Sequence, residues 1–227
     1  HRDLHSFPTR RSSDLLVTLS RSLRQGVEAL GLNLDDAQQK QLLAYLALLG
    51  KWNRVYNLTA VRDPQEMLTH HILDSLALVP PLRQHTQGRP LRLLDVGSGG
   101  GLPGVVIAIA CPEISVHCVD AVAKKAAFIQ HAAGELGLPH LRGLHSRVEN
   151  LAGPYELIVS RAFASLADFT RWSEKSLAGQ GVWLAMKGKY PHEEVQALPA
   201  HIQVFQHQEL EVPGLNARRC LLWMRRV

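Results

Sequence analysis

The residues most suited to chemistry lie in one short stretch, Asp95-Val96-Gly97-Ser98-Gly99-Gly100-Gly101-Leu102-Pro103-Gly104. An apolar run ends at Asp95, and five glycines follow within eight residues. Glycine allows positive φ angles and lets a ligand approach the backbone closely, because it has no Cβ. The apolar residues that come next predict a short buried helix, whose first N–H groups carry a partial positive charge. The stretch therefore predicts a ligand-binding turn at the carboxyl end of a parallel strand.

This glycine-rich turn fits two classes of cofactor-binding protein. Gly99-x-Gly101-x-x-Gly104 matches the dinucleotide fingerprint, and Asp120 follows at about the spacing of a ribose-binding acid. The acid-x-Gly-x-Gly-x-Gly pattern from Asp95 to Gly101 is instead usual in proteins that bind S-adenosylmethionine, whose aminoacyl group has no phosphate. A plain turn of small residues is the third interpretation, although so much glycine costs backbone entropy. The turn alone leaves the cofactor open.

The composition excludes several classes of protein. The chain has 227 residues, of which 46% are hydrophobic and 20% charged, as in ordinary globular proteins. No apolar run is long enough to cross a membrane, and no secretory signal is evident. Three cysteines without a CxxC pair favour buried thiols in a reducing cytoplasm, and twelve histidines without metal-ligand spacing predict no metal site. The net charge of +5 weakly favours a polyanionic partner.

Helical patterns occupy the first third of the chain. Residues 1–15 show no apolar periodicity and resemble a translated adapter sequence, so we expect a non-native leader there. Apolar residues at helical spacing predict a first helix from about Leu16. Asp35 and Gln38 form a capping box at the start of a second helix. We expect residues 16–88 to form an N-terminal helical region.

A third helix and a linker complete this region. Asp63-Pro64 is a helix start signal, with the aspartate as N-cap and the proline in the first turn. Pro80-Pro81 is expected to end that helix. The polar segment from Gln84 to Pro90 then suits a linker.

Strand and helix patterns alternate over residues 89–227, which predicts βαβ units, a parallel sheet and helices on both faces. The expected strands are 91–96, 114–119, 140–145, 156–160, 181–186, 201–208 and 218–226, and the expected helices are 102–110, 123–136 and 166–177. The last two strands have no helix between them, so they predict an antiparallel edge hairpin. This ending suits a methyltransferase better than a dinucleotide fold. We therefore predict a Rossmann-like class I methyltransferase fold, a seven-stranded, mostly parallel sheet, with an N-terminal helical appendage.

Ligands of open parallel sheets bind beyond the carboxyl ends of the strands, where this chain places several polar residues. Asp120 ends an apolar strand and is expected to accept hydrogen bonds from both hydroxyls of a ribose, or else to cap the next helix. Glu149 is expected to accept from an adenine amino group while the Val148 N–H donates to the ring, or else to form an exposed pair with Arg147. Arg161 suits a carboxylate or RNA, or else is a solvated surface cation.

Six motifs in register from about Leu16 to the C-terminus resemble the bacterial small-subunit rRNA (guanine-N7)-methyltransferase family RsmG, also called GidB. They are Lys51-Trp52-Asn53, Tyr56-Asn57-Leu58-Thr59, His71-Ile72-Leu73-Asp74-Ser75, the glycine stretch from Asp95 to Gly104, Ser146-Arg147-Val148-Glu149 and Ser160-Arg161-Ala162-Phe163-Ala164. The glycine stretch is weakly specific alone, whereas the order of all six is strongly specific. The chain departs from the family's frequent Gly-Pro-Gly at Gly99-Gly100-Gly101, which is expected to loosen the turn.

The resemblance implies S-adenosylmethionine as the cofactor and one guanine N7 of 16S rRNA, free or in a small-subunit precursor, as the target. It places the cofactor at Gly97, Leu102, Val148, Glu149 and Arg161. Residues 89–227 would then be the methyltransferase domain. We expect a cytoplasmic monomer without a membrane or metal partner.

The expected chemistry needs no catalytic base. Guanine N7 is a lone-pair nucleophile without a proton, so the residues only position the reactants and match their charge. Candidate phosphate contacts are Lys51, Arg54, Arg62, Lys187 and Lys189, each of which also fits a solvated surface cation. Trp52 and Tyr56 stack a base or, as their helical spacing favours, pack in the core.

Two other functions compete with methyl transfer to RNA. A nicotinamide-dependent oxidoreductase is supported only by the glycine fingerprint and Asp120. A non-catalytic RNA-binding module would retain a vestigial cofactor site. Cofactor binding and turnover on rRNA separate the three.

Overall fold

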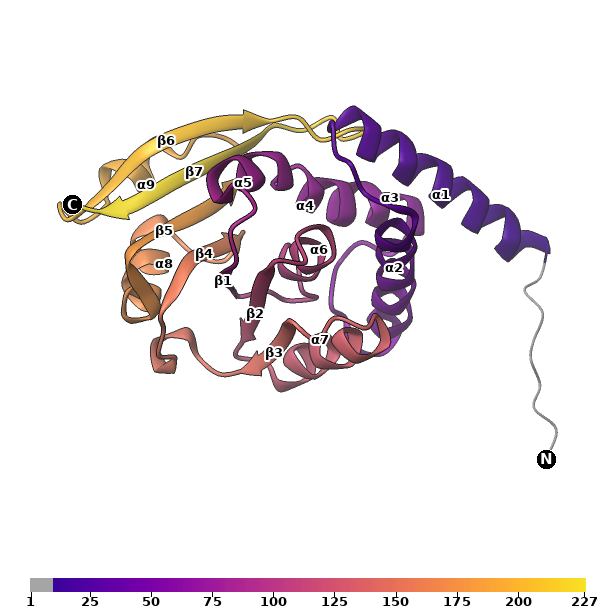
Figure 1. The fold of residues 1–227 in the computed structure, drawn as a ribbon, viewed down its shortest axis with the longest axis horizontal. Helices are drawn as coiled ribbons and strands as arrows, with labels where there is room; N and C mark the ends of the chain where they lie inside the picture. Colours follow the sequence, from indigo (N-terminus) through magenta and orange to yellow (C-terminus); the bar gives the residue numbers. More distant parts are fainter. Residues whose placement is uncertain (1–9) are drawn as a thin grey trace.

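A twisted sheet carries the cofactor-binding turn. The computed structural model describes residues 10–227, with side chains from Ser13 onward. Within this range the strands lie in the order β3-β2-β1-β4-β5-β7-β6 (Figure 1). The strands are β1 (Leu91–Val96), β2 (Ile114–Asp120), β3 (Leu141–His145), β4 (Tyr155–Arg161), β5 (Leu177–Lys187), β6 (Ile202–Leu210) and β7 (Arg219–Arg226).

Strands β1 to β5 pair in parallel, and β7 runs antiparallel between β5 and β6. The predicted seven-stranded sheet with an antiparallel edge hairpin is therefore confirmed. Leu93 and Leu94 of β1 are both fully buried but belong to different apolar clusters, one on each face of the sheet. Burial on both faces explains why two consecutive residues of this strand, Leu93 and Leu94, are apolar.

Helices cover both faces of the sheet. Helices α2 and α4 to α7 lie on one side, and α8 and α9 lie on the other (Figure 1). The α-helices are α1 (Arg10–Ala29), α2 (Asp36–Tyr56), α3 (Pro64–Met67), α4 (Asp74–Leu76), α5 (Val79–Thr86), α6 (Gly104–Ala110), α7 (Ala123–Glu135), α8 (Leu166–Ser173) and α9 (His192–Gln196), with the single-turn helices η1 (Leu68–Leu73), η2 (Val148–Asn150) and η3 (Glu174–Ser176). Helix α9 was not predicted, and α8 ends four residues before the expected Leu177.

The N-terminal helices differ in part from expectation. Helix α1 begins at Arg10, so it includes residues 10–15 of the segment we expected to be a leader, while residues 1–9 lie outside the described residues. Helix α2 has the predicted capping box, because the Gln38 N–H donates to Asp35 Oδ1 at 2.8 Å and the Asp35 N–H donates to Gln38 Oε1 at 3.0 Å.

The helical path after Asp63 continues further than predicted. Asp63 caps α3 as expected, and the path then runs through the π-helical turn η1 into α4 and α5. Pro80-Pro81 does not end a helix but lies in the first turn of α5. A proline is tolerated there because the first N–H groups of a helix have no intrahelical acceptor. Consequently the expected linker begins only after Thr86.

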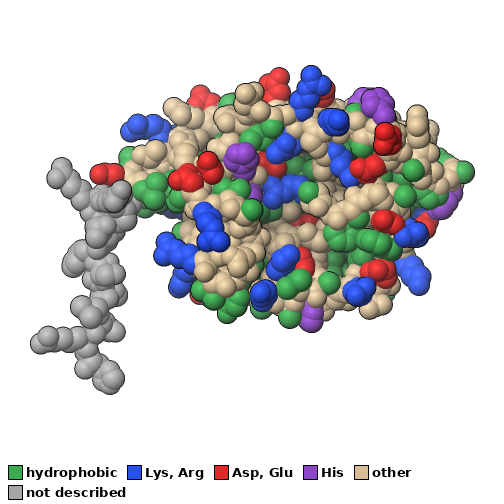
Figure 2. All heavy atoms as spheres, turned by 180° about the vertical axis from the view of Figure 1, so that it is seen from behind, with side chains coloured by type: hydrophobic (Ala, Val, Ile, Leu, Met, Phe, Trp, Pro, Cys, Tyr) green, Lys and Arg blue, Asp and Glu red, His purple; other side chains and the backbone are tan. Residues whose placement is uncertain are grey.

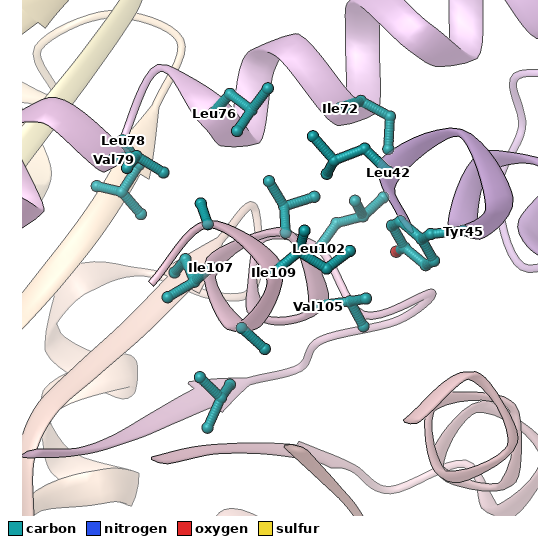
Figure 3. Close-up of a cluster of buried hydrophobic side chains, with 14 of the residues drawn as sticks. Leu42, Tyr45, Ile72, Leu76, Leu78, Val79, Leu102, Val105, Ile107 and Ile109 are labelled. Atoms are coloured by element: carbon teal, nitrogen blue, oxygen red, sulfur yellow. The ribbon is translucent and has the colours of Figure 1, made fainter. Parts of the chain in front are cut away.

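Helix α6 joins the helical region to the sheet. All seven of its residues are buried, and apolar side chains from α2, η1 and α4 pack above it (Figure 3). The predicted start at Leu102 was two residues too early, because α6 begins at Gly104 after Pro103. All three cysteines are buried and free, as expected. One continuous apolar cluster thus fixes the position of the glycine turn relative to α2.

Candidate active site

The glycine-rich turn lies between the carboxyl end of β1 and the start of α6. Gly97 and Gly101 have φ angles of +65° and +88°. A Cβ at Gly97 would lie 2.1 Å from Cδ2 of Phe163, and a Cβ at Gly101 would lie 2.4 Å from Cγ2 of Val105. Both the backbone angles and the lack of space therefore require glycine at these two positions.

Asp120 and Tyr45 hold this turn in place. The Gly99 N–H donates to Asp120 Oδ2 at 3.0 Å, and the Val122 N–H donates to Asp120 Oδ1 at 2.9 Å. The Tyr45 hydroxyl of α2 donates to the Gly100 carbonyl, a contact that the sequence did not predict. Each Asp120 oxygen keeps a second lone pair, so the carboxylate can shape the turn and still accept from a ligand.

The side chain of Asp95 contacts the N-terminus of α6 from the buried side of the helix. Its side chain is fully buried, and its Oδ2 accepts from the Gly104 N–H at 2.8 Å. Burial raises the pKa of Asp95 to about 7, although the hydrogen bond from Gly104 opposes this shift. Pro103 has no N–H, and the Val105 N–H donates to the Gly101 carbonyl. The Gly104 and Val105 N–H groups are therefore occupied within the protein and are not available to hold the pyrophosphate of a dinucleotide.

Two adjoining cavities open on either side of Gly97. The Asp120 cavity, of about 440 Å³, is lined by Gly97, Asp120, Val148, Glu149, Ala162 and Phe163 among others. The Arg161 cavity, of about 480 Å³, is lined by Gly97, Leu102, Asp74, Arg161, Ala162 and Arg219 among others. All six residues that we expected to bind the cofactor line one cavity or the other. Gly97 and Ala162 line both and mark the boundary.

The Asp120 cavity fits the nucleoside part of S-adenosylmethionine. Asp120 and Glu149 provide carboxylate acceptors for hydroxyl and amino groups, and the buried Val148 provides an apolar wall. The ring of Phe163 lies edge-on to Trp172 with 5.9 Å between centroids, and both rings line the same cavity. Acceptors beside an aromatic wall match a nucleoside better than they match a phosphate.

Arg161 does not project freely into its cavity, because a buried carboxylate holds it. Its Nη1 lies 2.9 Å from Asp74 Oδ2 and also donates to the His70 carbonyl at 3.1 Å. Arg219 Nε lies 2.6 Å from the other oxygen, Asp74 Oδ1. Asp74 is only 2% exposed, whereas the two arginine side chains are 20% and 22% exposed. We refer to Asp74, Arg161 and Arg219 as the arginine clamp; the interpretation of Arg161 as a solvated cation was wrong.

Sequence reasoning gave no role to Asp74 or Arg219. Asp74 lies in one of the six motifs that resemble the RsmG family. An aspartate within an apolar helical pattern could have indicated that this acid is buried. The start of β7 offered no comparable signal for Arg219. The two residues are 145 positions apart in the chain, so only the fold brings them together.

His71 also lines the Arg161 cavity, and it is neutral near pH 7. Its Nε2 lies 2.7 Å from Thr59 Oγ1. Burial and, to a smaller extent, the positive charge of Arg161 together lower the pKa of His71 to about 4. The pair ties the loop after α2 to η1.

The basic residues proposed to contact phosphate lie at different places. Lys187 Nζ lies 2.9 Å from Glu194 Oε2 and donates to the Ala164 carbonyl at 3.0 Å, so this ammonium group is occupied within the protein. Lys51 and Arg54 are exposed on α2, away from the two cavities, and Lys189 is exposed after β5. Lys and Arg side chains are interspersed with Asp and Glu over the face in Figure 2, so no single patch identifies an RNA surface there.

Trp52 packs inside the protein, as its helical spacing favoured. Its ring lies 5.4 Å from that of Phe128 and 5.3 Å from that of His131, measured between centroids. Tyr56 is 38% exposed, with its ring 5.2 Å from Trp52. Trp52 is therefore partly buried among aromatic rings, which fits packing better than stacking on a base.

The described part of the chain has no group of three or more His, Cys, Asp or Glu side chains placed to hold a metal ion. None of the described helices combines the length and the apolar character needed to cross a membrane.

The strand order, the edge hairpin and the glycine turn define a class I methyltransferase, an S-adenosylmethionine-dependent enzyme fold. Solved structures share it. TrmN from Thermus thermophilus superposes with a TM-score of 0.55 at 19% identity over 70% of this chain, which spans about half, 53%, of that chain. A Burkholderia thailandensis 1,6-didemethyltoxoflavin-N1-methyltransferase with bound S-adenosylhomocysteine superposes with a TM-score of 0.54 at 18% identity, over 81% of this chain and 89% of that chain.

Sequence comparison narrows this class to one family. The family profile described as GidB, rRNA small subunit methyltransferase G, matches residues 38–222. The ribosomal RNA small subunit methyltransferase G of Acidovorax ebreus (strain TPSY) is 66% identical over 93% of this chain and 97% of its own length. The protein of the same name from Polaromonas sp. (strain JS666 / ATCC BAA-500) is 62% identical over 89% and 92%. The chain belongs to the rRNA small subunit methyltransferase G (GidB) family, and the resemblance of its six motifs is confirmed.

Proposed function

We propose that this protein transfers a methyl group from S-adenosylmethionine to N7 of one guanine in 16S rRNA. Two cavities that meet at Gly97 carry the proposal, since one fits a nucleoside and the other opens beside it. A cytoplasmic monomer acting on the small ribosomal subunit or its precursor is consistent with this reaction. The helical region of residues 16–88 supports the turn through Tyr45 and contributes Asp74 and His71, among others, to the Arg161 cavity, whereas residues 89–227 form the rest of that cavity and line the Asp120 cavity.

Six residues would hold the cofactor. Asp120 would accept from the ribose hydroxyls, while Glu149 and the Val148 backbone would bind the adenine edge. The backbone of Gly97 would pass close to the ligand, beside the apolar side chain of Leu102. Arg161, oriented by Asp74, would bind the carboxylate of the aminoacyl group. When bound, the cofactor supplies an electrophilic methyl group on a sulfonium sulfur.

The residues around the Arg161 cavity suit positioning rather than proton transfer. Guanine N7 carries no proton, so no base is needed. His71 is neutral and bonded to Thr59, and Asp74 is occupied by two guanidinium groups. These residues would therefore orient the base and exclude water, which reduces the entropic part of the barrier.

The candidate RNA contacts differ in quality. Lys51, Arg54 and Lys189 are exposed and can reach phosphate groups, each with a salt-dependent contribution. Lys187 is a weaker candidate, because its ammonium group is paired with Glu194. Because Lys187 lies at the end of β5, it can instead support the loop that follows this strand.

Transfer of a labelled methyl group to small subunits that lack the modification tests the proposal. We expect label at guanine N7 in 16S rRNA, located by nuclease digestion and mass spectrometry. Asp120→Ala should abolish labelling, whereas Asp168→Ala, an exposed aspartate on α8, should not change it. Binding of S-adenosylhomocysteine without turnover would favour a non-catalytic RNA-binding module. Stabilisation by NAD(H) alone would favour the oxidoreductase.

A further inference from the structure

A third cavity, outside the predicted cofactor site, lies beside the arginine clamp. It encloses about 340 Å³ between the loop after β5 and the paired strands β6 and β7. We name it the Tyr190 cavity, and its main lining residues are Lys189, Tyr190, His207, Glu209, Arg218 and Arg219.

The Tyr190 cavity adjoins the Arg161 cavity. Gly188 and Arg219 line both. Arg219 is fixed in this shared wall, because its Nε is bonded to Asp74 and its Nη1 donates to the Arg218 carbonyl at 2.9 Å. A ligand in one cavity would therefore lie next to a ligand in the other.

The charge of the Tyr190 cavity suits an anion. Lys189 and Arg218 are exposed, and neither side chain forms an ion pair or hydrogen bond within the described part of the chain. Glu209 is the single carboxylate among the residues that line this cavity in the described chain. Arg219 adds a third cationic side chain, whose charge Asp74 balances in part, so the cavity keeps a positive charge that would attract a phosphate group.

Aromatic rings form another part of the wall. The Tyr190 ring lies 4.7 Å from the His192 ring and 4.8 Å from the His207 ring, measured between centroids. The ion pair between Lys187 and Glu194 anchors the chain on both sides of Tyr190. Glu194 also accepts from the Leu166 N–H at 2.8 Å, so the anchor extends to α8. The rings are therefore held in place before any ligand binds.

We propose that the Tyr190 cavity binds the nucleotide next to the target guanine, with its phosphate at Lys189, Arg218 and Arg219 and its base against Tyr190 and His207. Cations beside rings are the usual means of binding single-stranded RNA. The inference rests on the proposed function, because it takes the neighbouring Arg161 cavity as the site of the target base.

The double variant Lys189→Gln/Arg218→Gln tests the phosphate contacts. Its matched control is Lys175→Gln/Arg225→Gln, which removes the same charge from exposed residues, one in η3 and one near the far end of β7. We expect the KM for small-subunit RNA to rise about tenfold in the double variant, with kcat within about twofold. The affinity for S-adenosylhomocysteine should stay unchanged. Loss of that affinity in the same proportion would overturn the proposal, since it would indicate general disruption.

The salt dependence of RNA binding gives a second readout. Removal of two phosphate contacts to a single strand should reduce the slope of log K against log salt by about 1.4. A KM and slope equal to those of the control would overturn the proposal. Direct binding of a 16S rRNA fragment tests whether the Tyr190 cavity contacts RNA, even if no methyl transfer is seen. Failure of the proposed reaction and failure of the proposed RNA contact are therefore separate results.

The variant Tyr190→Leu tests the stacking surface while keeping an apolar side chain against the core. RNA affinity should fall by about fivefold or more. An unchanged affinity for RNA would contradict the proposal that a base lies in the Tyr190 cavity.

Discussion

Asp74→Asn should destabilise the protein far more than an equivalent change at its surface. The substitution keeps the size of the side chain but removes the carboxylate that lies between Arg161 and Arg219. Removal of one partner from a fully buried ion pair costs about 3–5 kcal/mol. Because the two arginines are 20% and 22% exposed, water compensates them in part, and we expect about 3 kcal/mol. For a chain of this length, that lowers Tm by about 6–12 °C.

Urea denaturation measures this loss, with Asp168→Asn as the control. Asp168 also pairs with an arginine, Arg171, but the two side chains are 36% and 67% exposed. Such a surface pair contributes less than about 1 kcal/mol. Isothermal calorimetry should also show about tenfold weaker S-adenosylhomocysteine binding for Asp74→Asn, because Arg161 loses its anchor. A free energy of unfolding within about 0.5 kcal/mol of that of the control would contradict the stabilising role of the arginine clamp.

The remaining predictions concern the turn, the nucleoside and pH. Gly97→Ala should abolish cofactor binding and destabilise the protein by about 1–3 kcal/mol, whereas Gly179→Ala, with open space around its Cβ, should do neither; calorimetry checks both. Glu149→Ala should weaken S-adenosylhomocysteine binding by at most a few kcal/mol, about one buried charge-assisted hydrogen bond, and unchanged affinity would remove Glu149 from the site. Because burial raises the pKa of Asp95 from 3.8 to about 7, its contribution to stability is complete below about pH 4 and is lost as the pH rises through about 7. Asp95→Asn should therefore gain about 3–4 kcal/mol relative to the native chain between pH 4 and pH 8 in urea denaturation, and no relative gain would contradict the assignment.

Local patterns predicted the elements that position the site. The segment from Leu91 to Val96 gave β1 with both of its ends, because consecutive apolar residues such as Leu93 and Leu94 are typical of a strand buried on both faces. The capping box at Asp35 was equally local. Pro80-Pro81 was misread because proline both ends helices and begins them, and only the packing of α5 decides between the two.

Contacts between distant residues account for what the sequence did not predict. Gly97 and Asp120 were expected to meet, since the carboxyl ends of neighbouring parallel strands share an edge. Tyr45 and Arg219 gave no such signal, because their partners lie 55 and 145 positions away in the chain. These two contacts depend on which face of α2 packs against the turn and on where β7 begins. Neither can be predicted from local composition.

The buried carboxyl group of Asp95, at the N-terminus of α6, limits how the cofactor specificity of this enzyme could be redesigned. Grafting a nicotinamide-type loop between β1 and α6 would leave Asp95 hydrogen-bonded to the Gly104 N–H, so this N–H would be unavailable to an incoming pyrophosphate. Exchange of the coenzyme would thus require a substitution in the hydrophobic interior as well as on the rim. We expect laboratory evolution confined to the loop to retain the sulfonium ligand.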